Sequence, residues 1–198
     1  MNARTEPGIE RRAFAAARGL RIERREGKAP MLAGHAAVFN QLSENLGGFR
    51  EQIKPGAFAD ALADDVRALF NHDPNFILGR STNGTLRLKE DDIGLAVEID
   101  VPDTSSVRDQ VLAPIERGDV SQMSFGFAVK PGGQDWAEDD EGRLIRTLTA
   151  VRLFDVSPVT FPAYPQTDIA MRSLDLWRTK RGRPNVLKAQ LLQTQALI

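Results

Sequence analysis

Residues 118–127 read GDVSQMSFGF, a stretch in which large and small side chains alternate. Side chains alternate between the two faces of a β-strand, so this pattern predicts a strand with one face in the core. The expected core face carries one hydroxyl among bulky apolar groups: Ser121, Met123, Phe125 and Phe127. The opposite face is small and forms a shallow strip: Gln122, Ser124, Gly126 and Ala128. Ser124 is therefore better placed than Ser121 to act as a nucleophile, although a small, solvent-facing serine without a catalytic role fits the same pattern.

The segments on either side of this strand also alternate and are separated by turn residues. We expect further strands over residues 31–40, 66–72, 77–81, 85–102 and 143–161, and turns at residues 73–75 and 90–94. Short helices are expected after Pro55-Gly56 and over residues 105–117, the second capped by Ser105 or Ser106, kinked at Pro114 and ended by Gly118. Many short strands and few helices predict an α+β domain around a mainly antiparallel sheet or barrel.

Length and composition limit the classes of protein that the chain can represent. The 198 residues are enough for one compact domain with tails. The absence of cysteine excludes a disulfide framework, a thiolate metal site and a thiol nucleophile. With two histidines and no glycine-rich phosphate loop, we expect no metal and no cofactor. No apolar run approaches the roughly 18 residues of a membrane span, and no export signal is recognisable.

Charge is distributed unevenly, although the formal net charge is only -1. Residues 1–28 hold eight basic and four acidic side chains, and residues 171–198 hold six basic and one acidic, so basic ends flank an acidic middle. We expect a mobile basic tail over residues 1–28, a folded domain over residues 29–173 and a second basic tail over residues 174–198. Such tails are either solvated or dock onto an acidic partner, and the pattern leaves contact with nucleic acid open.

A nucleophilic serine needs a base within hydrogen-bond reach and a third group that orients the base. His35 and His72 are the only histidines, so a histidine-assisted mechanism must use one of them. His35 falls mid-strand and is read as structural. His72 falls at a strand end between polar neighbours, a common place for a catalytic group, although a structural role fits it too.

Asp155 is the candidate for the third group. By strict alternation it shares a face with Val151 and Leu153, so we expect it to be at least half-buried. A buried carboxylate must be paired or hydrogen-bonded, and an imidazole N–H would serve. The alternative is an aspartate that caps the turn before Ser157-Pro158.

Five motifs occur in a fixed order: GxAxVF at residues 34–39, IKPGAF at 53–58, NHD at 71–73, MSFGF at 123–127 and DVSPVTFPAYP at 155–165. Together they resemble the prohead maturation protease family of tailed bacteriophages, distant kin of the herpesvirus assemblins. The resemblance covers residues 34–167 and implies an assemblin-like, mainly antiparallel β-barrel with a few surrounding helices. It implies that Ser124 is the nucleophile, His72 the base and Asp155 the orienting acid, at a position where the family often carries glutamate.

The resemblance also implies a serine endopeptidase that needs no cofactor and acts inside the assembling prohead in the host cytoplasm. Its expected substrates are the scaffold protein, the scaffold-like arm of the major capsid protein, and the protease itself, including the tail at residues 174–198. A homodimer is expected by the same resemblance. Two alternatives stay open: a non-catalytic, scaffold-type capsid-assembly protein on the same fold, and a binding module in which MSFGF is ordinary core.

Overall fold

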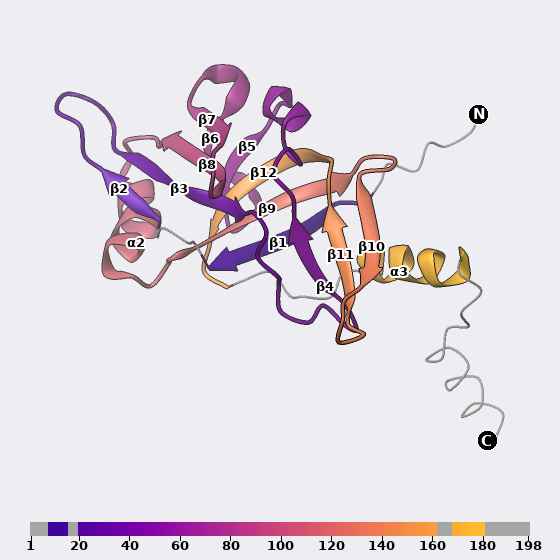
Figure 1. Ribbon diagram of the computed structural model, residues 1–198. Helices are drawn as coiled ribbons and strands as arrows, with labels where there is room; N and C mark the ends of the chain where they lie inside the picture. The colour runs from indigo at the N-terminus through magenta and orange to yellow at the C-terminus, as the bar shows by residue number, and fades with distance from the viewer. Residues whose placement is uncertain (1–7, 16–19, 162–167, 181–198) are drawn as a thin grey trace, which may run out of the picture. The chain divides into compact units, whose positions relative to one another are not determined.

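The structure, a computed structural model, describes residues 8–15, 20–161 and 168–180 (Figure 1). The chain divides into two units, Met1–Pro165 and Gln166–Ile198, and each is described by itself. The described strands all lie in the first unit, whereas helix α3 (Asp168–Lys180) lies in the second. Within the described ranges, no helix is both long enough and apolar enough to cross a membrane.

The largest sheet has five strands in the order β1-β9-β12-β5-β6. The strands are β1 (Glu10–Ala15), β9 (Gln122–Val129), β12 (Val151–Val159), β5 (Arg67–Phe70) and β6 (Asp73–Arg80). β9 pairs antiparallel with both β1 and β12, and β12 runs parallel to β5. Segments from the beginning, middle and end of the first unit therefore lie side by side, as the colours in Figure 1 show.

Two smaller sheets complete the strand inventory of the described residues. The four-stranded sheet has the order β2-β3-β8-β7, with bounds Arg21–Glu23, Met31–Val38, Gly94–Asp100 and Leu86–Glu90. The three-stranded sheet has the order β10-β11-β4, with bounds Gln134–Glu138, Leu144–Leu148 and Arg50–Ile53, and its β11–β4 pair is parallel. The predicted sheet-rich α+β class is confirmed. The described strands form three sheets, however, and do not confirm the closed barrel that the resemblance implied.

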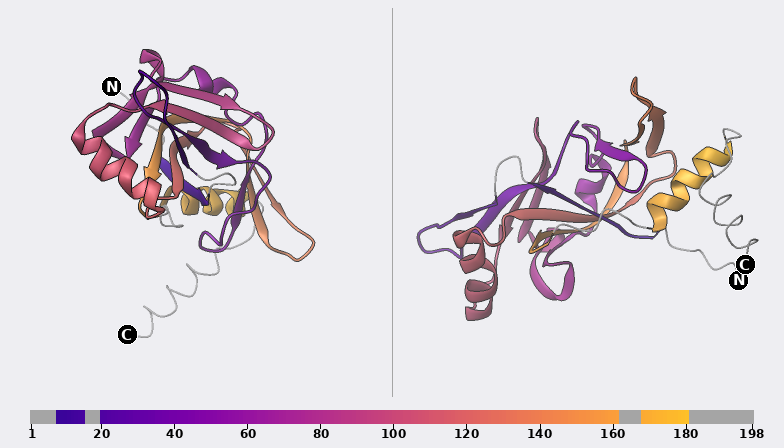
Figure 2. Two further views of the ribbon diagram at one scale, coloured as in Figure 1. Left: turned by 90° about the vertical axis from the view of Figure 1, so that its left-hand side faces the viewer. Right: turned by 90° about the horizontal axis from the view of Figure 1, so that it is seen from below.

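The helical elements are short. A continuous helical run consists of α1 (Ser105–Val107), η3 (Arg108–Leu112) and α2 (Ala113–Arg117), and it lies beside β2 (Figures 1 and 2). Thr104, not Ser105 or Ser106, is the cap, because its hydroxyl accepts a hydrogen bond from the Val107 N–H. η3 is a π-helical turn that ends two residues before Pro114, which has no N–H to donate. Gly118 ends the run with a φ of 84°.

Two further short helical turns are η1 (Asp60–Ala63) and η2 (Ser81–Asn83). The helix expected from Pro55-Gly56 onward is thus mainly a series of turns that ends in η1.

The two faces of β9 match the alternation expected from the sequence. Met123, Phe125 and Phe127 are fully buried, and the Phe125 ring packs edge-on against Phe58 with ring centroids 5.5 Å apart. The opposite face was expected to be a shallow, accessible strip, but Ser124 on it is also fully buried. Ser121 was expected among the core residues and instead lies exposed, just before β9 begins.

Three predicted boundaries need correction. Residues 1–28 do not form a tail throughout, because β1 and β2 fall inside this range and pair with β9 and β3. Residues 73–75 begin β6, and the turn before them is formed by Asn71 and His72. The boundary expected at residue 173 falls inside α3, and residues 181–198 lie outside the described part of the chain.

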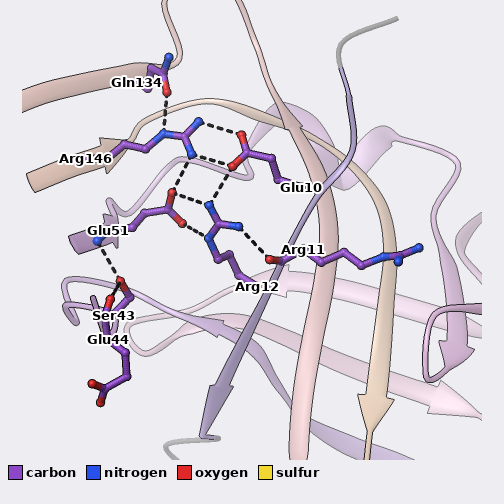
Figure 3. A network of polar contacts seen from close by, with 8 residues as sticks. All are labelled: Glu10, Arg11, Arg12, Ser43, Glu44, Glu51, Gln134 and Arg146. Atoms are coloured by element: carbon purple, nitrogen blue, oxygen red, sulfur yellow. Dashed lines mark hydrogen bonds and ion pairs between the residues drawn. The ribbon is translucent and has the colours of Figure 1, made fainter. Parts of the chain in front are cut away.

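A buried network of charges attaches β1 to the three-stranded sheet (Figure 3). Four charged side chains take part, each at most 4% exposed: Glu10, Arg12, Glu51 and Arg146. The guanidinium of Arg146 donates to both carboxylates at 2.7–2.9 Å and to Gln134 at 2.6 Å. The guanidinium of Arg12 donates to Glu51 at 2.8 Å and to Glu10 at 2.8 Å. Two cations thus face two anions, and the group is neutral as a whole.

The network explains why Glu10 and Arg12, near the N-terminus, are part of the folded domain and not of a solvated tail. β1 places Glu10 and Arg12 opposite Phe127 and Phe125, on the core side of β9. An isolated charge in this position would be strongly disfavoured, but each charge here has at least two hydrogen-bonded partners. The partners come from β1, β4 and β11, so the network fixes how the two sheets meet.

Substitution of Arg146 by methionine should lower the free energy of unfolding by about 3–5 kcal/mol, because it leaves two buried carboxylates with a single cation. Urea denaturation measures the loss. The matched control is Arg21→Met, which breaks an exposed pair with Glu23 and should cost at most about 1 kcal/mol. Equal losses for the two variants would contradict a stabilising role of the buried network.

Acid should weaken the same network. Burial pushes the pKa of Glu10 upward, but the hydrogen bonds and charges of Arg146 and Arg12 outweigh burial and bring the pKa below its usual 4.5. A carboxyl whose pKa is lower in the folded than in the unfolded state stabilises the fold at pH values above its unfolded-state pKa. This stabilisation is lost as the pH falls through its folded-state pKa. As the pH is lowered beyond about 4.5, the free energy of unfolding should therefore decrease. In Glu10→Gln this decrease should be less steep. Identical pH profiles for wild type and Glu10→Gln would exclude this contribution.

Candidate active site

Ser124 and Asp155 reach the same face of the sheet through the pairing of β9 with β12. Ser124 lies opposite Ser157, and Gly126 lies opposite Asp155. Neighbouring positions on these strands face the core, where Phe125 pairs with Val156. The face of the sheet that points away from the core thus carries a hydroxyl and a carboxylate on adjacent strands.

A β-bulge at Phe154 makes this arrangement possible. Phe127 pairs with Leu153 and Gly126 pairs with Asp155, so Phe154 is the extra residue on β12. Strict alternation had placed Asp155 on the same face as Leu153, and that prediction is wrong, because the extra residue reverses the faces beyond it. Leu153 is in the core, Asp155 is on the Ser124 side, and the Leu153 N–H beside the bulge donates to the carboxylate of Asp64 at 3.0 Å.

His72 reaches the site from a tight turn between β5 and β6. Phe70 pairs with Asp73, so the loop consists of Asn71 and His72, with φ values of 54° and 58°. Positive φ at both positions is the mark of a type I′ hairpin turn, whose twist matches that of the strands. Asparagine is common there, but histidine is not, and a left-handed conformation costs such a residue roughly 1–2 kcal/mol. The surrounding structure must hold His72 in this conformation.

The three side chains form one chain of hydrogen bonds. His72 Nε2 lies 2.7 Å from Ser124 Oγ, and His72 Nδ1 lies 2.5 Å from Asp155 Oδ1. An ionised carboxylate only accepts hydrogen bonds, so Nδ1 carries the ring proton and Nε2 accepts the proton of the serine hydroxyl. The side chains of His72 and Asp155 are each 9% exposed, and Ser124 is fully buried. This is the geometry in which a neutral imidazole can take a proton from a hydroxyl.

Two residues that the sequence reasoning did not single out complete the surroundings. Ser157, fully buried, donates its hydroxyl to Asp155 Oδ1 at 2.7 Å. Gly126 leaves the space that the same carboxylate fills, since a Cβ on this glycine would lie 2.2 Å from Asp155 Oδ2. The signal for Ser157 was present in the sequence, because it lies two residues after Asp155 and so shares its face of the strand.

Comparison with known proteins identifies a family. The family model of the caudovirus prohead serine protease matches residues 19–181, which include all three side chains of the hydrogen-bond chain. The chain belongs to this family. Membership makes it a serine peptidase with a role in prohead maturation, as the sequence predicted.

Individual relatives are similar over most of the chain. The prohead protease of Enterobacteria phage HK97 is 33% identical over 168 residues, which are 82% of this chain and 69% of the relative. Among solved structures, the bacteriophage T4 capsid assembly protease covers 78% of this chain and 98% of its own, with a TM-score of 0.48 and 13% identity.

The second histidine lies apart from this site. His35 is on β3, buried, and its Nε2 lies 2.9 Å from Asp91 Oδ2. Burial acts to raise the pKa of Asp91, but the bonds from His35 and from the backbone N–H groups of Gly94 and Ile93 bring it below the usual value. These contacts close the turn between β7 and β8, in agreement with the structural reading of His35. Within the described ranges, no group of three histidine or carboxylate side chains could hold a metal ion.

Substitution of Gly126 by alanine should displace the Asp155 carboxylate and break its hydrogen bond to His72, because the new Cβ and Oδ2 cannot both occupy the space between them. The loss can be followed as disappearance of the downfield imidazole Nδ1–H proton in the NMR spectrum. Gly34→Ala is the control, since a Cβ there meets its nearest atom, Leu20 Cα, at an ordinary 3.4 Å. An unchanged imidazole proton in Gly126→Ala would contradict this description of the site.

Proposed function

We propose that Ser124 is the nucleophile of this peptidase, His72 its general base and Asp155 the group that orients the base. The observation that carries the proposal is the continuous hydrogen-bond chain from Ser124 Oγ through His72 to Asp155, with contacts of 2.7 and 2.5 Å. These groups come from two strands and a turn that are distant in sequence. A purely structural core has no need to bring a hydroxyl, an imidazole and a carboxylate together in this order.

The proposed reaction follows from the protonation states. Ser124 Oγ attacks the scissile carbonyl carbon while its proton passes to His72 Nε2. Asp155 stabilises the imidazolium through the Nδ1–H bond, and Ser157 donates to the same carboxylate oxygen. The C–N bond then breaks as Nε2 returns the proton to the leaving amine. Water attacks the resulting ester with His72 again as base, which releases the acid and restores the serine hydroxyl.

Because Ser124 is buried, the site must change before a peptide can bind. Its side chain has no exposed surface, so an extended peptide can reach Oγ only after neighbouring groups move. The described conformation is therefore a closed form of the site, which must open before a peptide or a small reagent reaches Oγ.

We propose that the substrates are proteins of the assembling capsid. Membership of the prohead protease family, and the prohead protease of phage HK97 as a relative, support this substrate class. The scaffold protein, the scaffold-like arm of the major capsid protein, and the chain's own segment 174–198 are the proposed cleavage targets, inside the prohead in the host cytoplasm. The expected homodimer and any contact with nucleic acid stay predictions.

Ser124→Ala should abolish cleavage of capsid and scaffold proteins and of the chain itself, because no hydroxyl remains to attack. The protein is co-expressed with these partners, and mass spectrometry identifies the cut sites. Ser121→Ala is the matched control, since Ser121 is exposed and precedes β9; it should cleave like wild type. Cleavage by Ser124→Ala at the wild-type rate would overturn the assignment, and absence of cleavage by wild type would favour a non-catalytic assembly protein.

A further inference from the structure

One side chain, that of Asn71, fastens the turn that carries His72 to the end of β12. The Asn71 carboxamide donates through Nδ2 to Thr160 Oγ1 at 3.1 Å and accepts the Thr160 N–H through Oδ1 at 2.8 Å. Its backbone N–H donates to the carbonyl of Pro158 at 3.0 Å. The residue before the proposed base is thus held by one hydrogen bond to Pro158 of β12 and by two to Thr160, directly after this strand.

The strand pairing alone does not hold the turn in place. β5 and β12 pair at two positions only, Arg67 with Asp155 and Ala68 with Val156. On its other side, β5 pairs with β6, and register shifts on both sides of Leu69 interrupt that pairing. Among the residues that the structure describes, the turn and β12 are joined further along by the three Asn71 bonds and the His72–Asp155 contact.

The backbone conformation of the turn makes this fastening necessary. His72 has a φ of 58°, a sparsely populated left-handed conformation that persists only where the surrounding structure holds it. The preceding Asn71 tolerates its own φ of 54° well, and its carboxamide holds the turn in register with Thr160. A small rotation of the two-residue turn would carry the imidazole away from Ser124, because the ring projects from the tip of the hairpin.

We propose that Asn71 is a positioning residue for the catalytic histidine: its carboxamide, bound to Thr160, sets the place of the imidazole between Ser124 and Asp155. This inference rests on the proposed function of His72 as general base. Asn71 does not contact the peptide in this account. It determines the fraction of molecules in which Nε2 is aligned with the serine hydroxyl.

Three variants separate the carboxamide from the turn conformation. Asn71→Gly keeps the freedom to adopt positive φ but removes the carboxamide. Asn71→Asp also tolerates positive φ, and its carboxylate can accept both the N–H and the hydroxyl proton of Thr160, so it should restore the fastening. Asn40→Gly is the matched control, because Asn40 also has a positive φ, 56°, at the turn after β3, away from the site.

The first measurement is the second-order rate constant for labelling of Ser124 by a fluorophosphonate in the full-length protein, as a function of pH, together with the melting temperature. Asn71→Gly should react roughly 10- to 100-fold more slowly, with a melting temperature lowered no more than by Asn40→Gly. Asn71→Asp should recover most of the rate on the plateau of the pH profile, where the imidazole is neutral. Labelling of folded Asn71→Gly at the wild-type rate would overturn the positioning role.

The second measurement is the downfield imidazole Nδ1–H proton, assigned by its loss in His72→Gln. It should be present in wild type and Asn71→Asp, and lost or exchange-broadened in Asn71→Gly. If wild type is labelled no faster than Ser124→Ala, the proposed function fails, while this proton still tests the positioning by Asn71. If wild type is labelled at Ser124 and Asn71→Gly keeps both rate and proton, only the positioning by Asn71 is wrong.

Discussion

The carboxylate of Asp155 is the point on which the site depends. One of its oxygens accepts hydrogen bonds from both His72 and Ser157, and the other lies over the bare Cα of Gly126. It faces this way because of a single extra residue, Phe154, in β12. Without the bulge the aspartate would face the core, where a charge is disfavoured. The shape of one strand therefore decides whether hydroxyl, imidazole and carboxylate can meet.

The rest of the fold holds the strands that carry Ser124 and Asp155 in place. β9 is held on one side by β12 and on the other by β1, and β1 is anchored by the buried charges of Glu10 and Arg12. The serine is therefore on an inner strand, the acid is on its neighbour, and the histidine alone comes from a turn. Ser124 and Asp155 are positioned by strand pairing. His72 lies in a turn, and its place depends on the contacts of the turn, among them the hydrogen bonds of Asn71.

Much of the arrangement could be predicted from the sequence, because simple alternation holds along β9: Phe125 and Phe127 are in the core and Ser124 is on the other face. Alternation failed at Asp155, since a bulge leaves no mark in the pattern of large and small residues. Charge composition failed at Arg12, which reads as part of a solvated tail until partners from distant strands are known. The left-handed conformation of His72 was equally hidden, because histidine is not a typical residue for a type I′ turn. Barrel closure depends on how sheet edges meet, and periodicity within a strand does not contain that information.

The pairing of β1 with β9 has a consequence for biosynthesis. β1 pairs with a strand that is made more than a hundred residues later, and Glu10 meets Arg146 across a separation of 136 residues. Contacts this distant in sequence form late and slow folding. β9, which carries Ser124, has both neighbouring strands only after translation has passed Val159, the last residue of β12. A nascent chain therefore cannot bring Ser124, His72 and Asp155 together until β12 has been made.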